Sequence, residues 1–333
     1  MMQVTATGAE TFFSLQGRRY VKDGRLFLNA SGASLKGLFR GKRLCLTLFS
    51  EPIMAGRNAY MRLTVDGKTR RMRMPKGEKT VLLELPQGEH TFEIIKLTES
   101  ANNSLAFLCA ESDGDFLPVQ PSGGLKIEFI GDSITTGFGV LCRETYGEYK
   151  TKEQDVTKAF PYLTARALGA SFNLVAAGGW PIYKSKYAPF AIPDYYGNVD
   201  LTRNTEEWDF SAFVPDVIVV TLGTNDFSYL ADLSEEERAK ERAEVKHRFL
   251  AFLRRLLTQN AKMVLVYGFF PYPDLGVLTE EVARELDDPR VSTLEVKSAA
   301  SLNDVCAGHP GKRTHKLASA RLIKRIRSLV DLP

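Results

Sequence analysis

The sequence predicts an α/β protein in which an all-β sandwich of the jelly-roll type precedes a domain with a doubly wound parallel sheet. Up to about residue 120, apolar and polar residues alternate in short runs, which is typical of half-buried strands. After residue 124, short apolar runs alternate with amphipathic helical segments, as a parallel sheet covered on both faces requires. Because 333 residues exceed the usual size of one core, we predict two domains, 1–120 and 121–333, joined near the Pro-Ser-Gly-Gly sequence that starts at Pro121.

The first half is predicted to be a series of strands linked by tight turns. In the clearest run, Leu44, Leu46 and Leu48 fall on one face of a strand, and the same spacing recurs further along. Residue pairs that end in glycine are predicted to separate the strands as turns. The further apolar triplets are Met61, Leu63, Val65 and Val81, Leu83, Leu85, and the turn pairs are Asp23-Gly24, Asp66-Gly67, Gln87-Gly88 and Asp113-Gly114.

The second half is predicted to be a parallel sheet with helices between its strands. Four short apolar runs are predicted as strands, at 127–130, 172–176, 217–222 and 263–267. The clearest helix starts after Ser234, which is spaced to form a capping box with Glu237, and it ends near Gln259. A last helix is predicted over 314–329, with a basic face that is most simply solvated.

A serine follows the first strand of this predicted sheet. The apolar run ends at Gly131 and presents Ser133 on the next turn, where α/β proteins place a nucleophile. Taken alone, Gly-Asp-Ser is a weak signal, because these residues are also common in turns and at helix N-termini. Three downstream segments strengthen it, namely NLVAAGGW at 173–180, GTND at 223–226 and GHP at 308–310.

In their order and spacing, these four segments resemble the four sequence blocks of the SGNH, or GDSL-type, hydrolases. The resemblance covers about residues 125–330. It implies that Ser133 is the nucleophile, that His309 is the general base, and that Gly178 and Asn225 complete an oxyanion hole. It also implies a reaction that needs no metal and no cofactor.

These residue types suit the chemistry of acyl transfer. A serine hydroxyl is a poor nucleophile at neutral pH, so an imidazole must accept its proton during attack. His309 fits because Pro310 disfavours helical geometry there and keeps the ring on a loop; the alternative is a surface histidine on a turn. The oxyanion needs fixed donors, for which we predict the N–H groups of Ser133 and Gly178 and the amide of Asn225. The alternative for the GTND segment is an ordinary turn that ends a strand.

The residues around His309 depart from the family pattern. The acid that usually orients the imidazole stands two or three residues before the histidine, where this chain has Ala307 and Cys306. The nearest acid is Asp304, which we keep as a candidate catalytic residue. Three arrangements stay open: Asp304 reaches the ring, a backbone carbonyl orients it, or the site works as a Ser-His dyad. We favour the carbonyl or the dyad, because a neutral acceptor can still fix the tautomer.

Nearly the whole chain further resembles carbohydrate esterase family two, a group that includes acetyl xylan esterases. The resemblance rests on an N-terminal sandwich fused to a Gly-Asp-Ser hydrolase domain, and on the runs KIEFIGDSIT from Lys126 and WDFSAFVPD from Trp208. It implies a carboxylic ester hydrolase that removes O-acetyl groups from plant polysaccharides or their oligosaccharides. Two alternatives are a lipase or thioesterase of the same fold, and a carbohydrate-binding protein whose hydrolase domain is weakly active or inactive.

Residues that bind the sugar are predicted close to the oxyanion segment. Trp180 follows the oxyanion glycine, where its indole either stacks on a sugar ring or lies in the core. The segment 181–204 is long, rich in aromatic residues and includes Tyr183, and long loops of this kind are often functional. Phe227 and Tyr229, just after the GTND segment, are further candidates.

Composition and charge exclude some classes of protein. With 44 basic and 40 acidic residues, the net charge of +4 is too small to indicate nucleic-acid binding. No apolar run is long enough for a signal peptide or a membrane span, so we expect a cytoplasmic protein with no membrane partner, unless a leader was removed. The oligomeric state is left open.

The four cysteines show neither metal-binding spacing nor a dense disulfide framework. Cys45 and Cys109 lie in strand patterns and are predicted to be buried thiols. Cys306 lies near the proposed base, and a reactive thiol there is the less favoured alternative.

Overall fold

The structure, a computed structural model, describes residues 2–120, 124–143, 149–297 and 305–330. These residues form two compact units. The first contains the residues up to 120 together with Lys150–Gln154, and the second contains the other described residues. The predicted joint at 121–123 lies outside the described residues.

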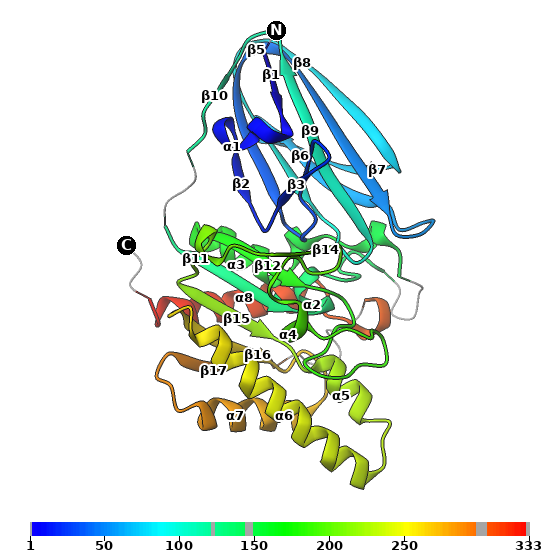
Figure 1. The fold of residues 1–333 in the computed structure, drawn as a ribbon, viewed down its shortest axis with the longest axis vertical. Helices are drawn as coiled ribbons and strands as arrows, with labels where there is room; N and C mark the ends of the chain where they lie inside the picture. The colour runs from blue at the N-terminus through cyan, green and yellow to red at the C-terminus, as the bar shows by residue number, and fades with distance from the viewer. Residues whose placement is uncertain (1, 121–123, 144–148, 298–304, 331–333) are drawn as a thin grey trace. The chain divides into compact units, whose positions relative to one another are not determined.

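The first unit is an antiparallel β-sandwich (Figure 1). Its elements are β1 Met2–Thr5, η1 Ala6–Gly8, α1 Ala9–Phe12, β2 Ser14–Gln16, β3 Tyr20–Lys22, β4 Arg25–Phe27, β5 Ser34–Pro52, β6 Ala59–Val65, β7 Lys68–Met74, β8 Gly77–Lys96, β9 Asn103–Ser112, β10 Asp115–Leu117 and η2 Thr151–Glu153. The strands pair in the order β3-β4-β9-β5-β8-β6-β7, with β1 on β9 and with β2 and β10 on β5. Inward-facing rings fill the core, where Phe13 meets Phe92 and Phe107 edge to face.

The alternation predicted for this unit is confirmed. Leu44, Leu46 and Leu48 are fully buried along β5. At Asp23-Gly24 and Asp66-Gly67 both residues have positive φ, as a two-residue hairpin turn between antiparallel strands requires. The hydrophobic pattern and these turn pairs therefore act together to set the strand register.

The turn predicted at Gln87-Gly88 is wrong, because β8 runs through both residues. Gly88 faces Gly41 of β5, next to a register shift in the pairing of the two strands. Facing glycines suit such a bulge, since neither side chain has to be packed where the regular ladder is interrupted. The Gln87-Gly88 pair, which indicates a turn in the sequence, therefore lies at an irregular point within one long strand.

The second unit is a parallel sheet with helices on both faces (Figure 1). Its elements are β11 Lys126–Gly131, α2 Ser133–Thr136, η3 Val156–Lys158, α3 Phe160–Leu168, β12 Ser171–Ala176, α4 Ile192–Tyr195, β13 Asn198–Asp200, β14 Asn204–Glu207, η4 Phe210–Ala212, β15 Val217–Thr221, α5 Thr224–Leu230, α6 Glu235–Leu257, β16 Lys262–Tyr267, α7 Pro273–Leu286, β17 Val291–Glu295, η6 Cys306–Gly308 and α8 Lys312–Arg327. The sheet order is β12-β11-β15-β16-β17, and every pairing is parallel.

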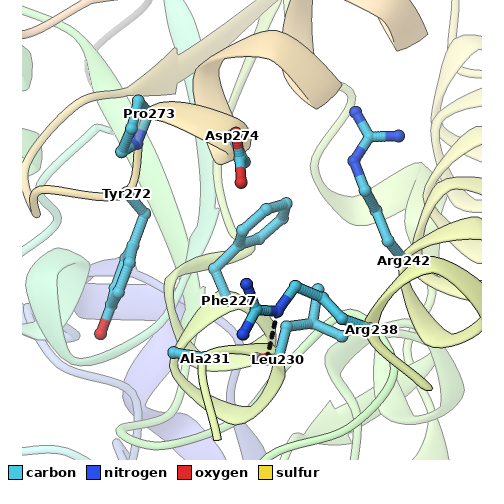
Figure 2. Close-up of a pocket in the computed structure, with 8 residues that line it drawn as sticks. All are labelled: Phe227, Leu230, Ala231, Arg238, Arg242, Tyr272, Pro273 and Asp274. Atoms are coloured by element: carbon cyan, nitrogen blue, oxygen red, sulfur yellow. Dashed lines mark hydrogen bonds between the residues drawn. The ribbon is translucent and has the colours of Figure 1, made fainter. Parts of the chain in front are cut away.

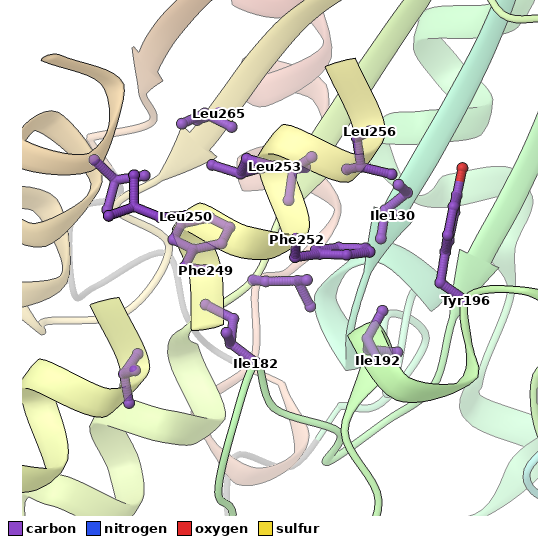
Figure 3. Packing of buried hydrophobic residues seen from close by; sticks show 14 of the residues in the cluster. Ile130, Ile182, Ile192, Tyr196, Phe249, Leu250, Phe252, Leu253, Leu256 and Leu265 are labelled. Carbon is purple, nitrogen blue, oxygen red and sulfur yellow. The ribbon is translucent and has the colours of Figure 1, made fainter. Parts of the chain in front are cut away.

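Neighbouring residues of β11 show which helices cover which face. Phe129 contacts Phe160 of α3, and α8 packs beside α3. Ile130 points to the opposite face and belongs to the core beneath α6 and α7. Figure 3 shows this second core, in which part of the 181–204 segment packs against α6 and the sheet; its labelled members are Ile130, Ile182, Ile192, Tyr196, Phe249, Leu250, Phe252, Leu253, Leu256 and Leu265.

The predicted elements of this unit are confirmed with small shifts at their ends. In α6, Ser234 and Glu237 form the predicted capping box. The last helix, α8, begins at Lys312 instead of residue 314. Three strands are absent from the prediction: β13 and β14, which pair with each other, and β17, whose residues lie half-buried at the edge of the parallel sheet and form no apolar run. Among the helices in the described ranges, none is both long and apolar enough to cross a membrane.

Candidate active site

The predicted site residues meet at one edge of the parallel sheet. Ser133 follows β11, Gly178 follows β12 and Asn225 follows β15, and these three strands are neighbours in the sheet. Because the carboxyl ends of parallel strands lie at the same edge, the three residues are brought together there. His309 reaches the same edge from the loop before α8.

Ser133 is presented by a sharp turn that depends on glycine. A Cβ atom on Gly131 would lie 2.0 Å from Thr135 Oγ1, so α2 packs too closely on the end of β11 for any other residue. Asp132 caps α2, since its Oδ1 accepts the Ile134 N–H at 3.0 Å. Ser133 is thus fixed at the start of α2, with only 9% of its surface exposed.

The nucleophile and the base are within hydrogen-bond distance. Ser133 Oγ lies 2.9 Å from His309 Nε2, although the two residues are 176 positions apart. On the other side of the ring, Nδ1 lies 3.0 Å from the carbonyl oxygen of Cys306. This contact places the proton on Nδ1 and leaves the Nε2 lone pair to accept the serine proton. The structure thus has the backbone-carbonyl arrangement; the alternative acid, Asp304, lies outside the described residues.

The surroundings of His309 keep its imidazole neutral. The Phe138 ring lies 4.4 Å from the imidazole, and the Phe270 ring meets it edge-on at 5.4 Å. Burial lowers the pKa of His309 to about 4, against the opposing effect of its hydrogen bonds to the backbone of Cys306 and Ala307. A neutral ring is the form that a general base requires.

The three predicted oxyanion donors lie on segments that suit this role. Ser133 N–H is in the first turn of α2, where N–H groups have no acceptor within the helix. Gly178 lies in a tight turn closed by the Trp180 N–H and the Ala177 carbonyl at 3.3 Å. The Asn225 amide nitrogen donates to Asp132 Oδ2 at 3.2 Å and to the Trp180 carbonyl at 3.1 Å. Both amide hydrogens are therefore engaged, and an oxyanion must share or displace one of these contacts.

Asp226, next to Asn225, has a role that the sequence analysis missed. Its fully buried carboxylate accepts the backbone N–H groups of Ile182, Tyr183 and Lys184 at 2.9, 2.8 and 3.2 Å. Burial raises the pKa of Asp226 to about 7, although these bonds oppose the change. Asp226 thus ties the segment that follows the oxyanion turn to α5. The only sequence signal is its place in the GTND segment.

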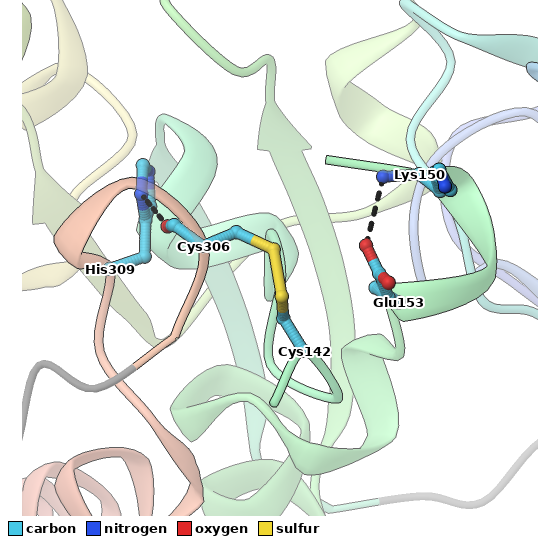
Figure 4. Close-up of a disulfide and its surroundings, with 5 residues drawn as sticks. All are labelled: Cys142, Lys150, Glu153, Cys306 and His309. Atoms are coloured by element: carbon cyan, nitrogen blue, oxygen red, sulfur yellow. Dashed lines mark hydrogen bonds between the residues drawn. A yellow bond between two sulfur atoms is a disulfide. The ribbon is translucent and has the colours of Figure 1, made fainter. Parts of the chain in front are cut away.

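A disulfide joins Cys142 to Cys306, three residues before the base (Figure 4). The spacing of the cysteines in the sequence does not predict this pairing. Cys45 and Cys109 are free thiols, and both are half-buried instead of buried as predicted.

The predicted sugar-binding residues are spread over different environments. Trp180 is only 6% exposed and packs on the rings of Phe190 and Tyr195 at 5.3 and 5.4 Å, which supports the core alternative for its indole. Tyr183 lies 4.8 Å from the Lys184 ammonium and 4.8 Å from the Arg248 guanidinium. Tyr229 lies 5.9 Å from the same ammonium, so these two tyrosines share a cation.

Phe227 lines a pocket between α5, α6 and the start of α7, and neither Ser133 nor His309 is among the lining residues of this pocket (Figure 2). The other residues that line this pocket are Leu230, Ala231, Arg238, Arg242, Tyr272, Pro273 and Asp274. An aromatic ring better placed for a sugar is Tyr187, which is 62% exposed. A Cβ on Gly179, the residue after Gly178, would lie 3.0 Å from the Tyr187 Cβ. Tyr187 therefore packs against the oxyanion turn, and its hydroxyl lies 3.1 Å from Ser228 Oγ, while most of the residue's surface stays exposed.

Two protein-family models match this chain. Residues 129–295, half of the chain, match the GDSL-like Lipase/Acylhydrolase family, and residues 15–121 match the Carbohydrate esterase 2 N-terminal family. A relative from Cellvibrio japonicus named acetylxylan esterase / glucomannan deacetylase is 27% identical over 98% of this chain and 91% of its own length. A second relative of that name from the same organism is 33% identical, over 52% of this chain and 50% of its own.

Solved structures share the whole fold. A family two carbohydrate esterase from Clostridium thermocellum, in complex with cellohexaose, has a TM-score of 0.85 and 25% identity, with 95% of this chain and 98% of that chain covered. A family two carbohydrate esterase from Cellvibrio japonicus has a TM-score of 0.87 and 25% identity, with 99% and 98% covered. An acetyl xylan esterase from the rumen bacterium Butyrivibrio proteoclasticus, at 22% identity and a TM-score of 0.87 over 98% and 99%, is alike in fold.

Proposed function

The chain belongs to the GDSL-like lipase/acylhydrolase family, and we propose that it is a serine esterase that removes O-acetyl groups from carbohydrate. The observation that carries this proposal is the 2.9 Å contact between Ser133 Oγ and His309 Nε2 at the carboxyl edge of the sheet. The match of residues 15–121 to the Carbohydrate esterase 2 N-terminal family supports a carbohydrate ester over other esters. The two relatives named acetylxylan esterase / glucomannan deacetylase support acetyl as the group removed.

The reaction has two halves, formation and hydrolysis of an acetyl-enzyme, and each residue of the site acts in both. His309 Nε2 accepts the Ser133 proton while Oγ attacks the acetyl carbonyl carbon, and the Cys306 carbonyl holds the ring in place. The N–H groups of Ser133 and Gly178 and the Asn225 amide stabilise the oxyanion. The imidazolium then protonates the sugar oxygen as its bond to the acetyl carbon breaks, so the sugar leaves with a free hydroxyl and an acetyl-enzyme remains. Water attacks this ester by the same route, and acetate is released.

The substrate class that we propose is an acetylated xylo-, gluco- or manno-oligosaccharide. The relatives' names support this choice, and so does the cellohexaose bound to a structure with the same fold. The exposed Tyr187 ring beside the oxyanion turn offers an apolar face on which a sugar ring can stack. The lipase and thioesterase alternatives lack comparable support.

A cytoplasmic location stays a prediction. The Cys142–Cys306 disulfide weighs against it, because disulfides persist mainly in oxidising compartments.

Acetate release from a panel of acetylated xylo-, manno- and gluco-oligosaccharides tests the proposal. The intact chain should release acetate, and Ser133→Ala should lose turnover by several orders of magnitude while still binding the sugar. Ser328→Ala is a matched control, because its hydroxyl is exposed at the end of α8 and donates to the Arg325 carbonyl at 2.7 Å. Sugar binding by the intact chain with no acetate released would favour the carbohydrate-binding alternative instead.

A further inference from the structure

The Cys142–Cys306 disulfide connects the two segments that carry the nucleophile and the base (Figure 4). It joins residues 164 positions apart, with Cα atoms 5.8 Å from each other. Cys142 ends the series of turns that begins at Ser133, and Cys306 begins the short turn that ends at His309. A covalent link therefore runs close beside the hydrogen bond between Ser133 and His309.

On the side of the base, Cys306 holds the imidazole through its backbone. Its carbonyl oxygen accepts the His309 ring Nδ1–H at 3.0 Å and the His309 backbone N–H at 3.2 Å. The two residues between them, Ala307 and Gly308, both have positive φ, at 53° and 69°. Such a turn is unfavourable for alanine, so it persists only where its surroundings impose it.

On the side of the nucleophile, the segment from Ser133 to Cys142 is compact. Phe138 N–H donates to the Ser133 carbonyl at 3.0 Å, and Cys142 N–H donates to the Gly139 carbonyl at 2.7 Å. A Cβ on Gly139 would lie 3.0 Å from the Cys306 Cβ. The disulfide therefore fastens the turn that carries the base onto a well-braced segment of backbone.

We propose that Cys306 is a positioning residue for the catalytic imidazole, and that the Cys142–Cys306 disulfide keeps its carbonyl in the place where related hydrolases use an acid. The inference rests on the proposed function. Opening the disulfide releases the turn at Ala307 and Gly308, so the Cys306 carbonyl no longer fixes the ring. Turnover then falls, and substrate binding changes little, because the link acts on the base, which takes part in proton transfer and not in holding the sugar.

The reaction that opens the link needs a dithiol as reductant. Cys142 is half-buried and Cys306 is fully buried, so a thiolate attacks the Cys142 sulfur and the Cys306 sulfur leaves, taking up a proton. The second thiol of the reductant then attacks the mixed disulfide, freeing the Cys142 thiol and closing the reductant into a cyclic disulfide. Two electrons and two protons pass to the protein.

Steady-state kinetics on 4-nitrophenyl acetate and on an acetylated xylo-oligosaccharide test the proposal, with the intact chain before and after treatment with dithiothreitol. We expect kcat to fall roughly ten- to hundredfold on reduction, with KM changed little, since small misplacements of a catalytic group have effects of this size. Reoxidation should restore the rate. Cys142→Ser/Cys306→Ser should start at the low rate and not respond to dithiothreitol.

A matched control uses the free cysteines. Cys45→Ser/Cys109→Ser keeps the disulfide and should respond to dithiothreitol as the parent does. The pH dependence of kcat separates a loss of positioning from a simple loss of folded protein. A released His309 ring regains contact with water, so its pKa, and with it the midpoint of the acid limb of kcat, rises towards the ordinary histidine value of 6.5. Unfolding of part of the sample would lower kcat without moving this midpoint. Far-UV circular dichroism of the reduced protein should stay native.

The outcomes also separate this inference from the proposed function. If the oxidised protein releases no acetate, the proposed function fails. If the oxidised protein is active and reduction leaves kcat unchanged, or lowers it only by the fraction that unfolds, the positioning role is wrong and the esterase assignment stands.

Discussion

At the scale of single residues, the neutral state of His309 is the feature with the clearest consequence for activity. Burial between Phe138 and Phe270 lowers its pKa to about 4, compared with the ordinary value of 6.5. Between these two values a free histidine is charged, whereas His309 keeps its lone pair. The base therefore remains competent in moderately acidic solution.

We expect the acid limb of kcat/KM on an acetylated oligosaccharide to have its midpoint near pH 4. The midpoint follows from initial rates in buffers of constant ionic strength, from neutral to acidic pH. Samples held at each pH and then assayed at neutral pH show whether acid has unfolded the protein. A midpoint at or above 6.5 would contradict the effect of burial on this ring.

The sequence predicted the pair Ser133 and His309 but not what orients the histidine. The serine and the histidine stand in segments whose order and spacing are specific, and the structure brings them within 2.9 Å. The Cys306 carbonyl carries no comparable signal, because every residue has a carbonyl and its direction depends on the turn at Ala307. The disulfide is equally hidden, since four cysteines contain six possible pairs and sequence alone does not choose between them.

At the scale of elements, α5 and the segment after the oxyanion turn are held together by one buried carboxylate. Asp226 accepts three successive N–H groups, from Ile182 to Lys184. The same segment follows Trp180, whose carbonyl accepts the Asn225 amide. Asp226 therefore stabilises this region and also helps to position the Asn225 amide, one of the oxyanion donors.

We expect Asp226→Ala to lower the free energy of unfolding by at least about 1–3 kcal/mol, because it leaves buried donors without an acceptor. kcat should fall as well, since the Asn225 contact with Trp180 loses its support. Urea denaturation and steady-state kinetics measure the two effects. Parent-like stability in Asp226→Ala would show that the three N–H groups find other acceptors.

The matched variant Asp226→Asn has no ionisable group and gives the pH dependence. The folded pKa is about 7 and the ordinary value is 3.8, so the folded state holds the extra proton between these values. The contribution of Asp226 to stability is therefore fully present below about 3.8 and is lost as the pH rises through 7. The parent should lose stability relative to Asp226→Asn over this range, as urea denaturation at several pH values would show.

The elements that the sequence predicted are those with a strong pattern. The central strands β11 and β15 are buried on both faces, which makes their apolar runs easy to recognise. The edge strand β17 has no such run, and the glycine of Gln87-Gly88 marks a bulge where a turn is equally consistent with the sequence. Whether a segment becomes an edge strand or a bulge depends on the strand that it pairs with, and the local sequence pattern does not carry that information.

At the scale of the whole molecule, the division into two units follows the change in periodicity, except for one short segment. Lys150–Gln154 belongs to the first unit, although it lies beyond the last strand of that unit in the sequence. Its contacts explain this. Arg71 donates to the Lys152 and Gln154 carbonyls at 2.8 and 3.2 Å, and the buried Gln154 side chain accepts the Glu99 N–H at 3.3 Å. No periodicity in five residues could reveal such contacts.

We expect Gln154→Ala to loosen the first unit and leave the second unchanged, because it removes the acceptor of the buried Glu99 N–H. An unsatisfied buried donor costs about 1–3 kcal/mol, so amide hydrogen exchange around Glu99 should become roughly tenfold faster or more. Exchange in β11 and β15 should stay at the parent rate. Gln259→Ala is the control in the second unit, where Gln259 donates to the Tyr196 hydroxyl at 2.7 Å, and it should speed exchange near Tyr196 alone. If either variant accelerated amide exchange equally in both units, the two units would open together and not separately, which would contradict this prediction.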